Sequence, residues 1–168
     1  MGDMRYLVRE KIFSIGGDFW VSDEHGNQAF FVDGKALSLR QTFELQDTSG
    51  AVVAVIRKKL WSWRDTMEIE RGGAVIATVQ PAIFSPLHHR SDIQLADGGE
   101  LEAVGNFLEK EFEIRQGGTV VAQVSRSWFQ IRDTYAVDVP DGADAALMIA
   151  IAVSLDRIEH DQEQQGAR

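Results

Sequence analysis

The strongest constraint on this chain is a β-hairpin unit that recurs along its length. Residues 112–124 align without a gap with residues 67–79, and seven of the thirteen aligned positions are identical. A second gapless overlay, at a constant offset of 68 residues, matches residues 50–67 with residues 118–135. Repetition of one antiparallel unit predicts a single sheet that is built from many similar hairpins.

Five hairpins are predicted from apolar residues that alternate on both sides of a turn containing Gly or Asp. They cover residues 19–32, 43–57, 67–79, 93–104 and 112–124. Gly pairs and Asp-Gly suit these turns because tight hairpin turns need positive φ. An opening strand near residues 6–13 and a last strand at residues 128–139 bring the count to about twelve strands. A sheet with this many antiparallel strands must close or stack to hide its edges.

The end of the chain indicates closure. Asp144 is placed to cap a helix, and the nine residues 145–153 are all apolar. A helix that is apolar all round is buried on every side, and this one is too short to span a bilayer. The fold class expected is therefore mainly β: a closed antiparallel β-barrel of about 12 strands around a buried hydrophobic C-terminal α-helix at residues 145–158. We expect residues 4–161 to form one domain and residues 162–168 a polar, disordered tail.

Composition excludes several classes of function. The chain has no cysteine, which excludes disulfides, thiolate chemistry, palmitoylation and cysteine-ligated metals. Its net charge of −9 argues against non-specific nucleic-acid binding, because phosphate neutralisation needs a basic face. No apolar run approaches the ~20 residues of a transmembrane helix. We therefore expect a cytoplasmic protein with no cofactor, no metal and no nucleic-acid partner.

Two segments of the sequence resemble the LURP-one-related family. They are the strand Trp128-Phe-Gln-Ile-Arg-Asp-Thr-Tyr135 and the helix that ends in Leu155-Asp156-Arg157-Ile158, set among the hairpin repeats. That family belongs to the Tubby C-terminal-like superfamily, with tubby domains and phospholipid scramblases. The resemblance implies a twelve-stranded barrel around a central C-terminal helix. It also implies a role at anionic phospholipid headgroups, which tubby domains bind through basic side chains on the barrel surface.

That functional implication carries over only in part. Scramblases have palmitoylated cysteines and a membrane-inserted terminal helix, whereas this chain has no cysteine and nothing hydrophobic after Ile158. Scramblase activity is therefore not expected. No residues here match the phosphoinositide-binding motif of tubby domains, so that site is not carried over.

The best candidate for a ligand-binding surface is a basic and aromatic segment at residues 57–64. Its four bases would attract phosphate oxygens, and its two indoles could lie at a lipid interface. The alternative is a solvated strand corner, with both Trp side chains packed against the barrel and the Lys residues covering its edge. The candidate residues are Arg57, Lys58, Lys59, Trp61, Trp63 and Arg64.

Two other motifs are interpreted as structural. The tripeptide Arg-Asp-Thr occurs at residues 64–66 and again at 132–134, where alternation along a strand favours a cross-strand ion pair or a capped strand end over acid–base catalysis. His88 and His89 are adjacent and would point opposite ways on a strand, so a shared metal is not expected. No catalytic residue is predicted.

Three classes of function follow from these observations. The first is a non-enzymatic cytosolic binding module, peripheral to a membrane, that recognises anionic phospholipid headgroups through the basic and aromatic segment. The second is a protein–protein interaction or regulatory domain without a small-molecule ligand. The third, an enzyme or carrier with its ligand inside the barrel, is disfavoured because the helix should fill the lumen.

Overall fold

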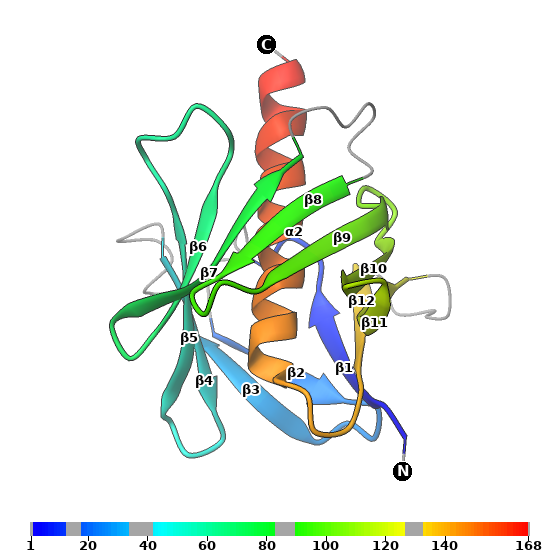
Figure 1. Ribbon diagram of the computed structural model, residues 1–168. Helices are drawn as coiled ribbons and strands as arrows, with labels where there is room; N and C mark the ends of the chain where they lie inside the picture. Colours follow the sequence, from blue (N-terminus) through cyan, green and yellow to red (C-terminus); the bar gives the residue numbers. More distant parts are fainter. Residues whose placement is uncertain (1, 13–17, 34–41, 83–89, 127–132, 168) are drawn as a thin grey trace.

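The computed structural model describes residues 2–12, 18–33, 42–82, 90–126 and 133–167, and within them it shows a closed barrel with one long helix inside (Figure 1). Each strand pairs antiparallel with its neighbours in sequence, and β1 pairs with β12 to close the barrel. The strands are β1 (Met4–Arg9), β2 (Phe19–Asp23), β3 (Gln28–Asp33), β4 (Thr42–Asp47), β5 (Val52–Lys58), β6 (Met67–Arg71), β7 (Ala74–Pro81), β8 (Arg90–Leu95), β9 (Glu100–Asn106), β10 (Glu111–Gln116), β11 (Thr119–Ser125) and β12 (Thr134–Val139).

The five predicted hairpins are confirmed, and their turns have the backbone that the sequence predicted. Gly72 and Gly73 in one Gly-Gly turn have φ of 60° and 83°, and Gly117 and Gly118 in the other have 57° and 85°. The two aligned hairpins also share a register shift at the same point, after Ile69 in one and after Ile114 in the other. The sequence repeat is therefore a repeat of local geometry.

The two flanking strands are shorter than predicted within the described residues. β1 ends at Arg9, and Lys11 adopts a positive φ of 53° beyond it. β12 begins at Thr134, and residues 127–132, where the predicted strand started, lie outside the described part of the chain.

The core lies between the inner face of the barrel and helix α2 (Ala145–Gly166). Alternate residues of each strand point inward, as in β6, where Met67 and Ile69 are buried while their neighbours are not. The helix is buried on all its faces from Met148 to Asp156, in agreement with the apolar run. Fully buried side chains from strands and helix include Val8, Val32, Leu45, Ile69, Val79, Ile93, Ile114, Ile149 and Ile151.

Helix α2 is longer than predicted: it continues to Gly166, whereas the sequence predicted an end at Ile158. The sequence after Ile158 is rich in Glu and Gln, which propagate a helix well in solvent. Arg157 and Asp161 add an ion pair at i,i+4 spacing, with 3.1 Å between Nε and Oδ1. The end of the apolar run thus marked the limit of full burial and not the limit of the helix. The extension emerges at one end of the barrel (Figure 1).

The helix begins as predicted at Asp144, whose side chain accepts a hydrogen bond from the backbone N–H of Leu147. Arg71 pairs with the same carboxylate, with 2.7 Å between Nη1 and Oδ2. The hydrogen bond from Arg71, assisted by that from Leu147, lowers the pKa of Asp144 below 3.8. One side chain therefore caps the helix and ties its start to β6.

Replacing Ile149 by Asp should prevent folding. Ile149 is fully buried in the middle of α2, and an unpaired carboxylate there would cost several kcal/mol, a large part of a domain's total stability. Thermal unfolding followed by circular dichroism should show no cooperative transition, whereas Gln164→Asp, on the exposed end of the same helix, should melt close to wild type. A wild-type melting temperature for Ile149→Asp would disprove the buried-helix core.

Replacing Asp144 by Ala should lower the free energy of unfolding by about 1 kcal/mol at pH 7. The pKa of Asp144 is lower in the folded protein than in the unfolded chain. The contribution of its carboxylate to the free energy of unfolding is therefore present above about pH 4, the pKa in the unfolded chain, and is lost as the pH falls through the pKa in the folded protein. Urea titrations at pH 7 and pH 2.5 should give a larger difference between wild type and variant at the higher pH. An equal difference at both values would contradict this account.

Candidate binding site at the β5–β6 loop

The candidate surface lies on the loop of residues 59–66, which joins β5 to β6 at the end of the barrel where α2 emerges (Figure 1). The base of the loop is closed by a hydrogen bond from Lys59 N to Thr66 O of 2.9 Å. The buried Thr66 hydroxyl donates to Arg64 O at 3.0 Å and lies 2.9 Å from the Ser62 hydroxyl. These contacts fix the two limbs of the loop and leave its tip, residues 60–63, projecting from the barrel.

Three large apolar side chains of the tip are open to solvent. The exposed fraction is 75% for Leu60, 95% for Trp61 and 81% for Trp63. The alternative in which both Trp side chains pack against the barrel is therefore wrong. Exposed apolar groups gathered on one projecting loop are typical of a surface that contacts a membrane or a partner.

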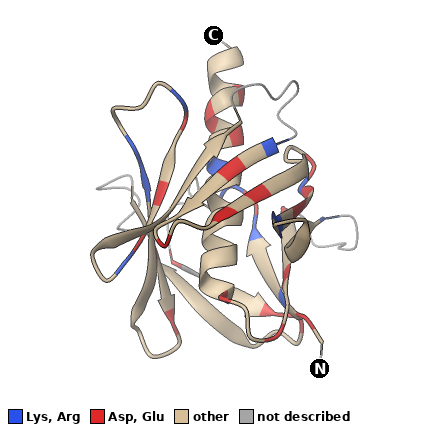
Figure 2. Cartoon of the chain, in the orientation of Figure 1, with Lys and Arg blue, Asp and Glu red and all other residues tan. Residues whose placement is uncertain are grey.

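Most of the basic residues around this tip have acidic partners. Arg57 lies 3.5 Å from Glu70, and Lys59 lies 3.7 Å from Glu68, both across the β5–β6 pair. Figure 2 shows basic segments on the loop and acidic segments near them on β6 and α2. Sequence reasoning missed these acids, because the predicted hairpins ended at residue 57 and restarted at residue 67 and so did not pair β5 with β6. The surface is thus much less positive than four isolated bases would make it.

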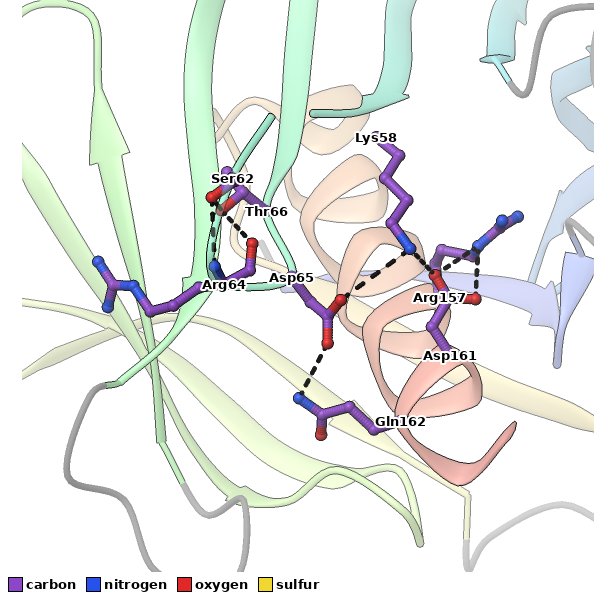
Figure 3. Close-up of polar contacts among 8 residues, drawn as sticks. All are labelled: Lys58, Ser62, Arg64, Asp65, Thr66, Arg157, Asp161 and Gln162. Carbon is purple, nitrogen blue, oxygen red and sulfur yellow. Dashed lines mark hydrogen bonds and ion pairs between the residues drawn. The ribbon is translucent and has the colours of Figure 1, made fainter. Parts of the chain in front are cut away.

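Lys58 belongs to the anchor of the loop and not to its outer surface. Its Nζ lies 2.7 Å from Asp161 Oδ2 and 4.0 Å from Asp65 Oδ1 (Figure 3). Asp161 is shared with Arg157, and Gln162 Nε2 donates to Asp65 at 3.5 Å. The polar extension of α2 beyond the predicted helix end at Ile158 therefore holds the loop.

Arg64 differs from the other bases because it has no carboxylate partner among the described residues. Its Nη1 donates to the backbone carbonyl of Pro81 at 3.1 Å, and its guanidinium carbon lies 4.9 Å from the centre of the Trp63 ring. The remaining N–H groups of this guanidinium can bind an anion.

A groove opens at the base of the loop, between the loop, the end of β7 and α2. Its volume is about 470 Å³. A smaller apolar recess of about 110 Å³ shares the wall of Pro81, Ala82 and Gln162, and Phe107 and Leu155 line its interior. The groove is lined by Ser62, Trp63, Arg64, Asp65, Pro81, Ala82, Gln162 and Gln165.

A buried charged cluster at the same end of the barrel is structural. Lys110 Nζ lies 3.1 Å from Asp156 Oδ1 and donates to Phe107 O at 3.0 Å, and Glu10 pairs with Arg126 at 2.6 Å. Burial raises the pKa of Asp156, against the opposing effect of Lys110. Lys110 and Asp156 are almost completely enclosed, so the cluster ties α2 to the strand ends and is closed to a substrate.

The other motifs add no chemistry in the described part of the chain. His88, His89 and Arg132 lie outside it. Asp65 pairs with Lys58 at 4.0 Å, but residues 64–66 lie in the loop before β6 and not on a strand, so the alternation on which the prediction rested is wrong there. The equivalent Asp133 has a positive φ of 58° and accepts from Glu10 N through its backbone carbonyl. Within the described residues no cluster of His, Asp and Glu has the geometry of a metal site. No helix there has both the length and the apolar character needed to cross a membrane.

These features define a class: a closed antiparallel barrel filled by its own C-terminal helix, with an exposed apolar loop at one end. The family model described as LURP-one-related matches residues 4–156. The chain belongs to the LURP-one-related family, as the sequence resemblance indicated.

Relatives come from bacteria and plants. The chain is 27% identical to the Bacillus subtilis protein YxjI over 95% of this chain and 96% of that protein. It is 26% identical to Protein LURP-one-related 15 of Arabidopsis thaliana, over 92% of this chain and 79% of that protein. The X-ray structure of an Arabidopsis thaliana protein superimposes with a TM-score of 0.70 at 22% identity, over 94% of this chain and 92% of that one, which shows a shared fold.

Replacing Asp161 by Asn should loosen the loop without unfolding the barrel. The change removes the nearer of the two carboxylates that pair with Lys58, an interaction of about 1 kcal/mol in a partly buried setting, and also the pair with Arg157. Hydrogen exchange followed by mass spectrometry should be about fivefold faster in peptides covering residues 59–66 and unchanged in β9 and β10. Glu163→Gln, which breaks only an exposed pair with Lys11, is the matched control. Unchanged exchange in the Asp161 variant would contradict the anchor.

Proposed function

We propose that this protein is a non-enzymatic module that binds anionic phospholipid membranes through the β5–β6 loop. The observation that carries the proposal is the exposure of Leu60, Trp61 and Trp63 on one projecting tip. Trp side chains suit the boundary between headgroups and acyl chains, where the ring is apolar and the indole N–H stays near water. Insertion of this tip would bury apolar area that water now covers.

The charges around the tip support an anionic surface over a neutral one. Arg64 has no carboxylate partner in the described part of the chain, and the side chains of Arg57 and Lys59 are about half exposed. Their ion pairs are exposed and weak, so both side chains can turn towards lipid phosphates at little cost. The net charge of −9 opposes approach, but salt screens it beyond about 8 Å at physiological ionic strength.

A non-enzymatic role is supported by the filling of the barrel. Helix α2 occupies the interior, and the described grooves lie at the surface. The buried cluster around Lys110 and Asp156 is enclosed and internally paired, which suits a structural role. The cytosolic location expected from the sequence stays a prediction.

The second candidate function is a protein–protein interaction through the same loop. The observation in its favour is again the apolar tip, since a protein partner could cover Trp61 and Trp63 as a membrane would. The two functions differ in their dependence on lipid, which the following experiment measures.

Replacing Trp61 and Trp63 by Ala should weaken membrane binding by a factor of ten or more, because burial of one large apolar side chain contributes about 1.5–3 kcal/mol. Flotation should be measured with phosphatidylglycerol-containing and pure phosphatidylcholine vesicles at low and physiological salt. Val52→Ser is the matched control, because it removes an exposed apolar side chain at the opposite end of β5.

Charge variants separate the electrostatic contribution to membrane binding from the apolar contribution of the Trp side chains. Arg57→Gln with Lys59→Gln should reduce the salt dependence and weaken binding less than loss of the two Trp side chains. Lys58 is kept, because it anchors the loop. Absence of wild-type binding to every vesicle would refute the membrane function and favour the protein–protein alternative.

A further inference from the structure

We infer that the groove at the base of the β5–β6 loop is a binding site for one lipid headgroup, and that it selects anionic headgroups that carry hydroxyl groups. This inference rests on the proposed membrane function and adds a ligand class to it. A glycerol phosphodiester, as in phosphatidylglycerol, has the chemistry that the groove would recognise.

The position of the groove suits a headgroup. Trp63 and Arg64 belong to the loop and also line the groove, so insertion of the tip would bring the groove to the level of the lipid phosphates. Its volume of about 470 Å³ lies in the range typical of small-ligand sites. The groove and the N–H donors of Arg64 therefore lie on the same side of the barrel as the apolar tip.

Arg64 supplies the anion-binding group. Only one of its N–H groups is used within the described residues, for the carbonyl of Pro81 at 3.1 Å, and that bond holds the guanidinium at the groove wall. The Trp63 ring beneath it, 4.9 Å from the guanidinium carbon, further restricts its position. A positioned guanidinium with unused donors binds a phosphate oxygen well.

Several other polar groups of the groove can accept hydrogen bonds, and we assign the selectivity to them. The Asp65 carboxylate lies in the same wall as Arg64 and opposes a compact, doubly charged phosphate. The amide groups of Gln162 and Gln165 add further acceptor oxygens. A phosphodiester with hydroxyl groups fits this arrangement, because its phosphate can contact Arg64 while its hydroxyls donate to the acceptors.

Gln162 gives an independent indication of a donor-bearing ligand. Its Nε2 faces Asp65 at 3.5 Å, which fixes the assignment of the amide, because reversal would bring two acceptors together. Its Oε1 is buried and has no hydrogen-bond partner among the described residues. Such an orphaned acceptor is costly, and Gln162 lines the groove, so a shift of its side chain that keeps the Nε2 contact with Asp65 would let a ligand hydroxyl reach the oxygen.

The test compares vesicles with equal molar fractions of one of two anionic lipids. The headgroup of phosphatidylglycerol carries two alcohol hydroxyls, and the phosphate headgroup of phosphatidic acid carries no alcohol. Wild-type protein should bind the phosphatidylglycerol vesicles about tenfold more tightly in flotation, the effect of one or two hydrogen bonds. Gln162→Ala should reduce this ratio to about one and leave binding to phosphatidic acid unchanged. Gln164→Ala, on the exposed side of the same helical turn, should keep the wild-type ratio.

A second arm uses soluble probes and separates a headgroup from free phosphate. Titration of the ¹⁵N-labelled protein with glycerophosphoglycerol, the soluble phosphodiester headgroup of phosphatidylglycerol, should shift the Trp63 indole resonance and not that of Trp20, with no such shift in Gln162→Ala. Inorganic phosphate at the same concentrations should give little shift. Equal shifts with both probes would overturn the hydroxyl selectivity.

The two arms distinguish failure of this inference from failure of the membrane function. Equal wild-type binding to both vesicles would overturn the headgroup selectivity while the loop remained a membrane contact. Absence of binding to any vesicle would refute the membrane function. In that case a glycerophosphoglycerol shift at Trp63 that requires Gln162 would still support the groove as a site, and absence of the shift would overturn it.

Discussion

The structure depends on the filling of a closed barrel by a helix that belongs to the same chain. Twelve strands hide every sheet edge but leave an interior that must be packed. Residues 145–153 meet this need because they are apolar on all sides, and Ala146, Ala150 and Ala152 keep the helix narrow where strands surround it. The inward side chains of β6 and β10, such as Ile69 and Ile114, complete the packing. With the interior occupied, contacts with other molecules are left to the surface and the ends of the barrel.

The same helix also organises one of those ends. Once α2 leaves the apolar interior, its sequence becomes polar and its side chains reach the strand ends instead of solvent alone. Lys110 and Asp156 mark the transition, and Asp161 and Gln162 contact Lys58 and Asp65 at the base of the β5–β6 loop. The position of the loop is therefore set by the packing of the core, although the loop itself is exposed. This link explains how a rigid interior can present a projecting apolar tip.

The parts of the fold that rest on local chemistry could be predicted from the sequence. Gly72 and Gly73 predicted their turn through positive φ, and Asp144 predicted the start of the helix through its capping side chain. Contacts between distant elements were not predictable to the same degree. That Lys58 meets Asp161 depends on the rotation of α2 within the barrel, which an all-round apolar pattern does not specify. The exposure of Trp61 likewise depends on how far the loop projects, and composition does not record this.

The pairing of the loop bases changes how an acidic protein would meet an anionic surface. Four unpaired bases would produce a long-range attraction, and the net charge of −9 would oppose it. With Arg57 and Lys59 partly neutralised by Glu70 and Glu68, long-range attraction is weak and short-range apolar contact must contribute most of the binding free energy. In the proposed membrane function, orientation would follow from this difference, because the end that carries the apolar tip exposes the largest apolar fractions, at Leu60, Trp61 and Trp63.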